Sequence, residues 1–214
     1  MTARLLIGSG NPGKQREYRE LLDGLDLDRV VPGDLDPVPP EPDETGATFA
    51  ENASHKARTY AAASGLRTVV DDSGLEVDAL GGAPGVRTRR YAGEDASDVD
   101  NNEKLLAALA GLPPERRGAR YVCVLALALP GDAGVRGGQP LTFARGTCRG
   151  RIATAPRGSG GFGYDPIFEP ASEPPGGRTL GLWSPAEKNA ISHRARAARR
   201  MAPRLVALAT QGGR

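Results

Sequence analysis

Hydrophobic residues in this chain follow two patterns, short apolar runs that are typical of strands and longer segments with helical spacing. The apolar runs predict strands at 4–9, 29–31, 68–71, 75–77, 120–129 and 141–152. The helical spacing predicts helices at 14–22, 48–63 and 98–109, and a last helix that begins near Pro185. Helices separate some of the strands, whereas a flexible loop at 130–140 joins the last two. This order predicts an α/β fold with a mixed central sheet and flanking helices.

Two of the predicted helices carry sequence signals for their first turn. Thr48 and Glu51 form a capping box ahead of an alanine-rich run. Ser184 has the place of an N-cap, with Pro185 in the first turn and Glu187 three residues after the cap. Both helices are therefore expected to begin at these residues.

The last predicted helix is unusual in its charge and in its proline. No acidic residue follows Glu187, and five arginines do: Arg194, Arg196, Arg199, Arg200 and Arg204. They could form a solvated face or attract a polyanionic substrate, and we favour the solvated face, except at Arg194. A net charge of +2 and an aromatic content of 5% argue against a nucleic-acid-binding protein. Pro203 is expected to kink or end the helix near Ala202.

Length and composition place further limits on the protein. A chain of 214 residues can bury a real core, and we expect one domain over 1–214. No apolar run approaches the roughly 18 residues of a membrane span, and the start leads straight into a strand, so we expect a cytoplasmic protein without a membrane partner. Cys123 and Cys148 fall in strand-like runs, which indicates buried free thiols.

Candidate chemistry begins with two adjacent carboxylates. Asp71 and Asp72 follow an apolar run, so they are expected where a buried strand ends and a cleft begins. A carboxylate pair in such a place suits Mg²⁺, which takes a few carboxylates, several waters and the phosphate oxygens of a substrate. The alternative is a surface turn, because Asp-Asp-Ser-Gly is also typical of turns.

A second candidate is a glycine-rich loop between a predicted strand and a predicted helix. Its residues are Ser9, Gly10, Asn11, Pro12, Gly13 and Lys14. Glycines let backbone N–H groups approach an anion, and the helix N-terminus and Lys14 add positive charge, so the loop fits a phosphate. With Gly8 it also resembles a P-loop, which would indicate a kinase or ATPase acting at the γ-phosphate. However, Gln15 stands where a P-loop has the Ser or Thr that binds Mg²⁺.

Five segments, taken in order, resemble one family, the inosine/xanthosine triphosphate pyrophosphatases. They are SGNPGK at 9–14, ETGATFAEN at 44–52, DDSGL at 71–75 with GGAPG at 81–85, GFGYDPIF at 161–168 and EKNAISHR at 187–194. The resemblance implies hydrolysis of non-standard purine nucleoside triphosphates (ITP, dITP and XTP) to the monophosphate and pyrophosphate, with Mg²⁺. It also implies a homodimer and a substrate cleft between two lobes.

The resemblance assigns roles to the residues that match its segments. It places the triphosphate on 9–14 and on Lys56, and the metal on Glu44 and Asp72. Asp72 is also implied as the general base. Asp71 is implied to act through the residues that contact the metal and substrate, without contacting either itself. From the residues alone, the two aspartates cannot be ranked.

The purine base is implied to contact a second set of residues: Ser73, Phe162, Gly163, Tyr164, Asp165, Lys188, His193 and Arg194. Phe162 offers an aromatic face to the purine. Lys188, His193 and Arg194 are hydrogen-bond donors, so they favour the oxygen at position 6 of hypoxanthine and xanthine over the amino group of adenine.

One segment departs from the family pattern. The family usually reads Tyr-Ser-Ala-Arg-Tyr where this chain has Arg87, Thr88 and Arg89 before Arg90 and Tyr91. Contacts of this loop, including contacts at a dimer interface, are therefore in doubt, but the catalytic residues are not affected.

Overall fold

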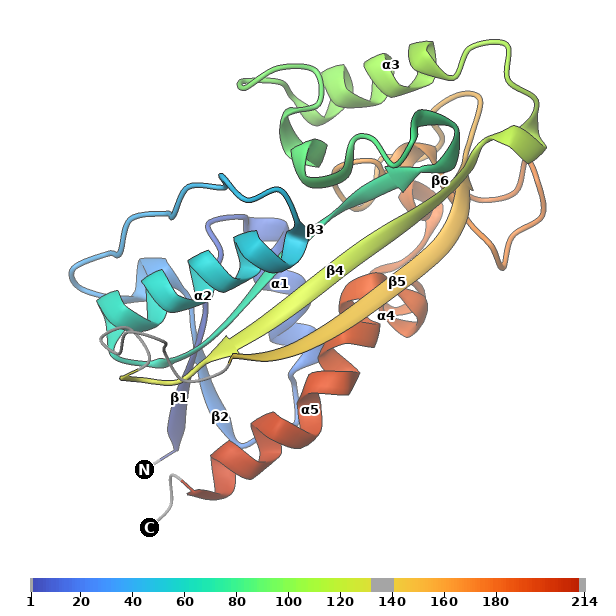
Figure 1. Cartoon of the computed structure of the whole chain (residues 1–214). Helices are drawn as coiled ribbons and strands as arrows, with labels where there is room; N and C mark the ends of the chain where they lie inside the picture. The colour runs from blue at the N-terminus through green and yellow to red at the C-terminus, as the bar shows by residue number, and fades with distance from the viewer. Residues whose placement is uncertain (1, 132–140, 212–214) are drawn as a thin grey trace. The chain divides into compact units, whose positions relative to one another are not determined.

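Within residues 2–131 and 141–211, which the computed structural model describes, six strands form one sheet in the order β2-β1-β3-β4-β5-β6 (Figure 1). Their bounds are β1 Ala3–Ile7, β2 Leu27–Val30, β3 Arg67–Val77, β4 Gly118–Ala128, β5 Thr142–Ile152 and β6 Phe168–Pro170. β1 pairs in parallel with β2 and with β3, whereas β5 and β6 are antiparallel. The predicted α/β fold with a mixed sheet is therefore confirmed.

The helices are α1 Pro12–Leu21, α2 Phe49–Ser64, α3 Asp98–Ala108, α4 Pro185–Ile191 and α5 His193–Gln211. Thr48 and Ser184 accept the capping hydrogen bonds of α2 and α4, and Glu51 and Glu187 complete the two capping boxes, as predicted. Among the described residues, no helix is both long enough and apolar enough to cross a bilayer.

The chain divides into two compact units that alternate along the sequence. Unit 1 contains Met1–Asp72, Cys123–Gly146 and Arg194–Arg214, and unit 2 contains Ser73–Val122 and Thr147–His193. The long strands β3, β4 and β5 contribute residues to both units. The expectation of a single domain stays a prediction.

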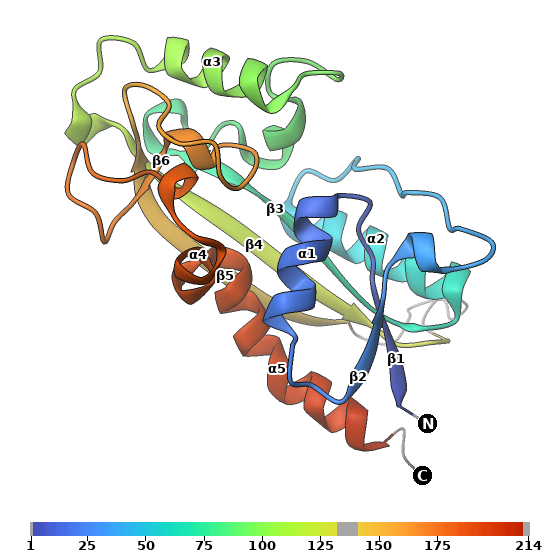
Figure 2. The same ribbon diagram turned by 180° about the vertical axis from the view of Figure 1, so that it is seen from behind.

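In unit 1, helices cover both faces of the strands. α2 lies on one face and α1 and α5 on the other, as the two opposite views show (Figures 1 and 2). Leu5 and Ile7 of β1 join one buried cluster with Tyr18 of α1 and Met201 of α5. Alternate strand residues face opposite sides, so Leu6, which is also fully buried, points toward the α2 face.

Unit 2 has an apolar core of its own. Leu75 of β3, Tyr121 of β4 and Phe168 of β6 pack there with Leu105 of α3. Cys148 belongs to this core and Cys123 to the core of unit 1, and both are free and buried, as predicted.

The structure corrects the predicted position of the two aspartates. The strands expected at 68–71 and 75–77 are one continuous strand, β3, and Asp71 and Asp72 lie in its middle, each 3% exposed. Neither a strand end nor a surface turn is present at this point. Buried backbone groups must be hydrogen-bonded, and β3 lies inside the sheet between β1 and β4, so strand pairing overrides the local turn preference of Asp-Asp-Ser-Gly.

The last predicted helix is also corrected. Ser192 has an extended backbone (φ −61°, ψ 157°) and separates α4 from α5. Beyond it, α5 passes through Pro203 and continues to Gln211, so the helix does not end near Ala202. Met201 and Leu205 are buried on either side of the proline, and this packing offsets its cost. Of the predicted loop at 130–140, residues 132–140 lie outside the described residues.

Candidate active site

The predicted site residues divide between the two units, and each group has its own contacts. The group in unit 1 comprises the loop 9–14, Glu44, Lys56, Asp71, Asp72 and Arg194. The group in unit 2 comprises Ser73, the loop 162–165, Lys188 and His193.

The glycine-rich loop is shaped by its own side chains. Asn11 is the N-cap of α1, and its Oδ1 accepts a hydrogen bond from the backbone N–H of Lys14 at 3.0 Å. Ser9 Oγ accepts from the N–H of Asn11 at 3.2 Å. Gln15 Nε2 donates to the carbonyl of Ser9 at 2.6 Å, so this side chain braces the loop. A Cβ atom on Gly8 would lie 2.7 Å from Val70 and 2.8 Å from Tyr60, which explains the glycine before the loop.

Asp71 lies between two cations of unit 1. Lys14 Nζ lies 3.2 Å from Asp71 Oδ1, and Arg194 Nε lies 3.2 Å from Oδ2. Arg194 also binds Glu17 Oε2 at 3.0 Å through a terminal nitrogen. Burial by itself lowers the pKa of Arg194, but the charges of Asp71 and Glu17 outweigh it and raise the pKa. Arg194 is therefore a permanent cation that orients Asp71.

Asp72 has different partners. Asn52 of α2 donates through Nδ2 to Asp72 Oδ2 at 3.0 Å, and Lys56 Nζ lies 3.6 Å from Oδ1. Lys56 also forms an ion pair with Glu44. Burial raises the pKa of Asp72 above its ordinary value, and the charges of Lys56 and Lys14 oppose this in part. A buried carboxylate with a raised pKa and a fixed orientation is suited to proton transfer.

Glu44 and Asp72 fit a shared Mg²⁺ site rather than a closed metal cage. Among the residues that the structure describes, no group of three His, Cys, Asp or Glu side chains is placed to hold a metal ion. The carboxylates of Glu44 and Asp72 nevertheless converge on one cation, the ammonium of Lys56. Mg²⁺ commonly takes only one or two protein carboxylates and completes its shell with water and substrate phosphates.

In unit 2, Asp165 organises the residues predicted to contact the base. Its Oδ2 accepts hydrogen bonds from Lys188 Nζ at 2.6 Å and from the N–H of Phe162 at 3.0 Å. Lys188 Nζ also lies 4.7 Å from the centre of the Phe162 ring. Tyr121 donates to Asp165 Oδ1 at 3.4 Å. Asp165 therefore holds an aromatic ring and an ammonium group next to each other.

His193 and Tyr164 are both buried in unit 2. The His193 ring stacks on Tyr121 at 4.7 Å with an interplanar angle of 7°. The Tyr164 hydroxyl donates to the carbonyl of Thr88 at 2.7 Å, and burial raises the pKa of this hydroxyl. Thr88, part of the segment that departs from the family pattern, also accepts a hydrogen bond from the N–H of Leu75 at 3.1 Å. The departing loop is thus tied to the predicted site through Tyr164.

Two other predicted site residues, Gly163 and Ser73, lie on the loop 162–165 and on β3. The N–H of Gly163 donates to Asp98 Oδ2 at 2.7 Å, and the Gly163 carbonyl accepts from Asn102 Nδ2 at 3.1 Å. Ser73 is buried on β3, directly after Asp72.

Three residues with clear roles in these clusters were missed from the sequence. Asn52 holds Asp72 and also accepts from the N–H of Gly46, two residues after Glu44. Glu17 pairs with Arg194, and Tyr121 carries His193. Asn52 is four residues before Lys56, so helical spacing places both on one face of α2, but the sequence assigned Asn52 no role of its own. No local signal marks Tyr121.

The chain is similar to known proteins over nearly its whole length. The model of the Ham1 family matches residues 5–204. A protein from Anaeromyxobacter sp. (strain Fw109-5), named dITP/XTP pyrophosphatase, is 46% identical and the match covers 97% of this chain and 99% of that protein. A protein of the same name from Nocardia farcinica is 49% identical, with 97% of each chain covered. The solved structure of a HAM1 protein from Coxiella burnetii has a TM-score of 0.82 and 39% identity, covering 95% of this chain and 98% of that one. The chain belongs to the Ham1 family.

Proposed function

We propose that this chain is a nucleoside triphosphate pyrophosphatase that hydrolyses dITP, XTP and ITP to the nucleoside monophosphate and pyrophosphate. The observation that carries the proposal is the surroundings of Asp72, a buried carboxylate held by Asn52 and Lys56 and influenced by the charge of Lys14. The names of relatives with 46% and 49% identity support the same reaction.

In this proposal, the triphosphate binds to the cations and backbone N–H groups of unit 1. The loop 9–14 precedes the N-terminus of α1, where N–H groups and the helix dipole favour an anion. Lys14 and Lys56 supply full positive charges. Both ammonium groups now contact carboxylates, so binding of the substrate exchanges part of these contacts for phosphate oxygens.

Asp72 is proposed as the general base. It removes a proton from the attacking water, the water oxygen bonds to the α-phosphorus, and the bond to the pyrophosphate oxygen breaks. Asn52 orients the carboxylate through its 3.0 Å hydrogen bond to Oδ2. Glu44 and Asp72 are the proposed ligands of Mg²⁺, which neutralises phosphate charge when it is bound.

The purine base is proposed to contact the residues around Asp165 in unit 2. Phe162 offers its ring, and Lys188 and His193 offer donors to the oxygen at position 6. Ser73 and 163–165 complete the set that the resemblance implies. A role of Arg194 in base recognition stays a prediction, because its guanidinium binds Asp71 and Glu17 in this structure. The homodimer and the cytoplasmic location also stay predictions.

A substrate panel with Mg²⁺ tests the proposed reaction. Pyrophosphate and orthophosphate are assayed separately with dITP, XTP, ITP, ATP and the pyrimidine triphosphates. The expected result is pyrophosphate and monophosphate from the three oxo purines and little product from the others. Release of orthophosphate and a nucleoside diphosphate instead would replace the proposal by an enzyme acting at the γ-phosphate.

A further inference from the structure

Unit 2 contains a cavity of about 210 Å³ that includes none of the proposed substrate or metal residues. Three arginines and one glutamate line it, Arg117, Arg151, Arg157 and Glu169, together with apolar atoms of Pro114 and Ile152. We call it the arginine pocket. Its volume is several times the roughly 30 Å³ that one water molecule takes in the liquid, so a small ion or molecule fits inside.

Arg117 is a rigid, buried cation in this pocket. Only 3% of the residue is exposed. Its guanidinium donates to the carbonyls of Leu109, Ile152 and Ala153, each at 2.7 Å. These bonds use three of its five N–H groups. Among the described residues Arg117 forms no ion pair, and burial lowers its pKa although the charge of Glu169 opposes the shift.

The other two arginines share a single carboxylate. Arg151 lies 3.3 Å from Glu169 Oε2, and Arg157 binds Oε1. The N–H of Gly176 donates to the same two oxygens at 3.2 and 3.3 Å. The glutamate is thus saturated with donors. By contrast, the Nε of Arg157 is buried and has no hydrogen-bond partner among the described residues.

These contacts leave the pocket with a deficit of negative charge. Three guanidinium groups face one carboxylate, so the formal charge of the four side chains is +2. A buried N–H without an acceptor is unfavourable, and a buried cation without a counter-charge is more so. If Glu169 were the only anion that the pocket needs, Arg117 and the Nε of Arg157 would be expected to share it. The charge of Glu169 reaches Arg117, but the guanidinium of Arg117 donates only to carbonyls, and the Nε of Arg157 has no acceptor among the described residues. An acceptor from outside the chain would therefore satisfy groups that the fold leaves unsatisfied.

We propose that the arginine pocket binds a small phosphate-class anion, orthophosphate or pyrophosphate, at a site separate from the proposed substrate residues. Planar guanidinium groups match the spacing of phosphate oxygens, and two negative charges balance the formal charge of the pocket. This assignment does not depend on the proposed function, because the site is defined by binding and not by turnover.

The test is calorimetric titration of the full chain with orthophosphate and, separately, with pyrophosphate, in buffer with EDTA and without Mg²⁺. The variant Lys14→Ala serves as the parent, so that any anion binding to which Lys14 contributes at the loop 9–14 is reduced in every titration. We expect one saturable site for at least one of the two anions. Adding Arg157→Gln is expected to raise the dissociation constant of the anion at least about tenfold, the scale of losing a hydrogen bond to a charged group.

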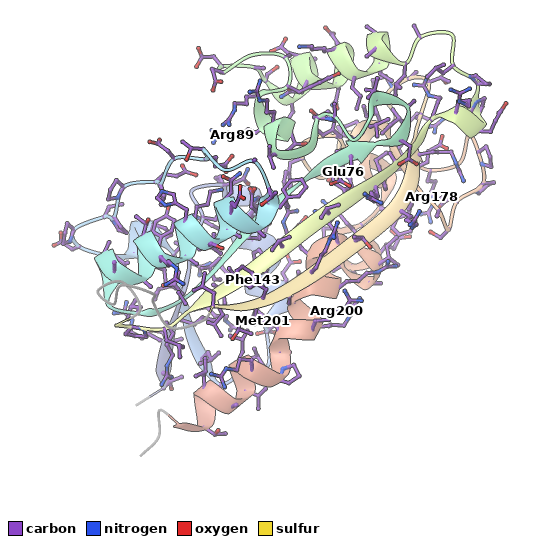
Figure 3. All side chains as sticks on the ribbon, viewed as in Figure 1. Glu76, Arg89, Phe143, Arg178, Arg200 and Met201 are labelled. Carbon is purple, nitrogen blue, oxygen red and sulfur yellow. The ribbon has the colours of Figure 1, made fainter. Side chains whose placement is uncertain are left out.

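Arg178→Gln is the matched control. Arg178 is an exposed arginine of the same unit, labelled in Figure 3, and it pairs with Glu173 and Glu187 outside the pocket. This control should leave the affinity unchanged, which separates the pocket from a general effect of charge. If Arg157→Gln does not fold by circular dichroism, Arg151→Gln replaces it with the same expectation. No saturable binding of either anion, or equal weakening by Arg178→Gln, would overturn the proposal.

Discussion

The two adjacent aspartates of β3 have different partners, and this difference indicates different roles. Asp71 is held between Lys14 and Arg194, whereas Asp72 is held by Asn52 and Lys56. The sequence could not rank the two. Two cations at Asp71 favour a carboxylate that stays ionised and paired with Lys14 and Arg194, and burial that raises the pKa of Asp72 favours a proton acceptor.

Asp72→Asn is expected to lower kcat by at least about a hundredfold, the usual scale for losing a general base. The change preserves shape and removes the charge that accepts the proton. Release of pyrophosphate from ITP is measured at saturating Mg²⁺. Asp71→Asn is the comparison, and it should act more on KM than on kcat because it releases Lys14 and Arg194. Near-full turnover of Asp72→Asn would remove this residue from the mechanism.

Lys14 and His193 are expected to affect different parts of the substrate. Lys14→Ala should lower kcat/KM for ITP and ATP by similar factors, because both nucleotides share the triphosphate. His193→Ala should lower kcat/KM for ITP more than for ATP. The loss of transition-state stabilisation for ITP is expected to be about 1 to 3 kcal/mol. The measurement is the ITP-to-ATP ratio of kcat/KM for each variant. If Lys14→Ala narrows this ratio and His193→Ala leaves it unchanged, the two assignments must be exchanged.

At the scale of elements, α2 shows how local signals position site residues. The capping box of Thr48 and Glu51 begins the helix, and Gly65 ends it in the left-handed conformation at φ 65°. One buried face of α2 carries Ala53 and Ala57 into the core and, on the same side of the helix, Asn52 and Lys56. The caps therefore fix the rotation and the register at which Asn52 and Lys56 approach Asp72.

Thr48→Ala is expected to lower the free energy of unfolding by about 1 kcal/mol, because the N–H of Glu51 loses its acceptor. Chemical denaturation followed by circular dichroism measures this change. Thr59→Ala is the matched control on the same helix. Its hydroxyl only donates back to the carbonyl of His55, a bond that adds little to a helix, so its loss should not destabilise the protein. Equal effects of the two substitutions would argue against the cap as the cause.

At the scale of the whole molecule, the open question is whether the two units unfold together. Each has its own buried core, but β3, β4 and β5 have residues in both. A strand cannot lose its pairing at one end without affecting the backbone that continues from it. We therefore expect one cooperative transition, consistent with the prediction of a single domain.

Leu5→Ala tests this cooperativity. Leu5 is fully buried in unit 1, and truncation should lower the free energy of unfolding by about 2 to 5 kcal/mol. Trp183, the one tryptophan of the sequence, reports on unit 2. Its fluorescence transition should move with the circular dichroism transition in Leu5→Ala, and equally in the reciprocal variant Leu105→Ala of unit 2. A fluorescence transition that stays in place in Leu5→Ala would show that the units unfold separately.

Much of this protein could be predicted from its sequence, because the signals are local. The period of the hydrophobic residues and the caps at Thr48 and Ser184 predicted the order of the elements and the mixed α/β sheet. The five matching segments predicted the family, which the comparisons confirm. Such features depend on residues within a few positions of each other, so they can be recognised in the sequence without the fold.

The partners of each site residue were decided only by the tertiary structure. The sequence Asp-Asp-Ser-Gly is typical of a turn, but strand pairing and burial place it in the middle of β3. The resemblance assigns Arg194 and His193 to the base, and this stays a prediction. Only the structure shows that the guanidinium of Arg194 also binds Asp71 and Glu17 and that the His193 ring stacks on Tyr121. Contacts between residues far apart in the chain depend on which faces of the helices and strands pack together. The local sequence pattern does not determine this packing. The arginine pocket could not be predicted from the sequence for the same reason. Its charged residues, at 117, 151, 157 and 169, come together only in the fold.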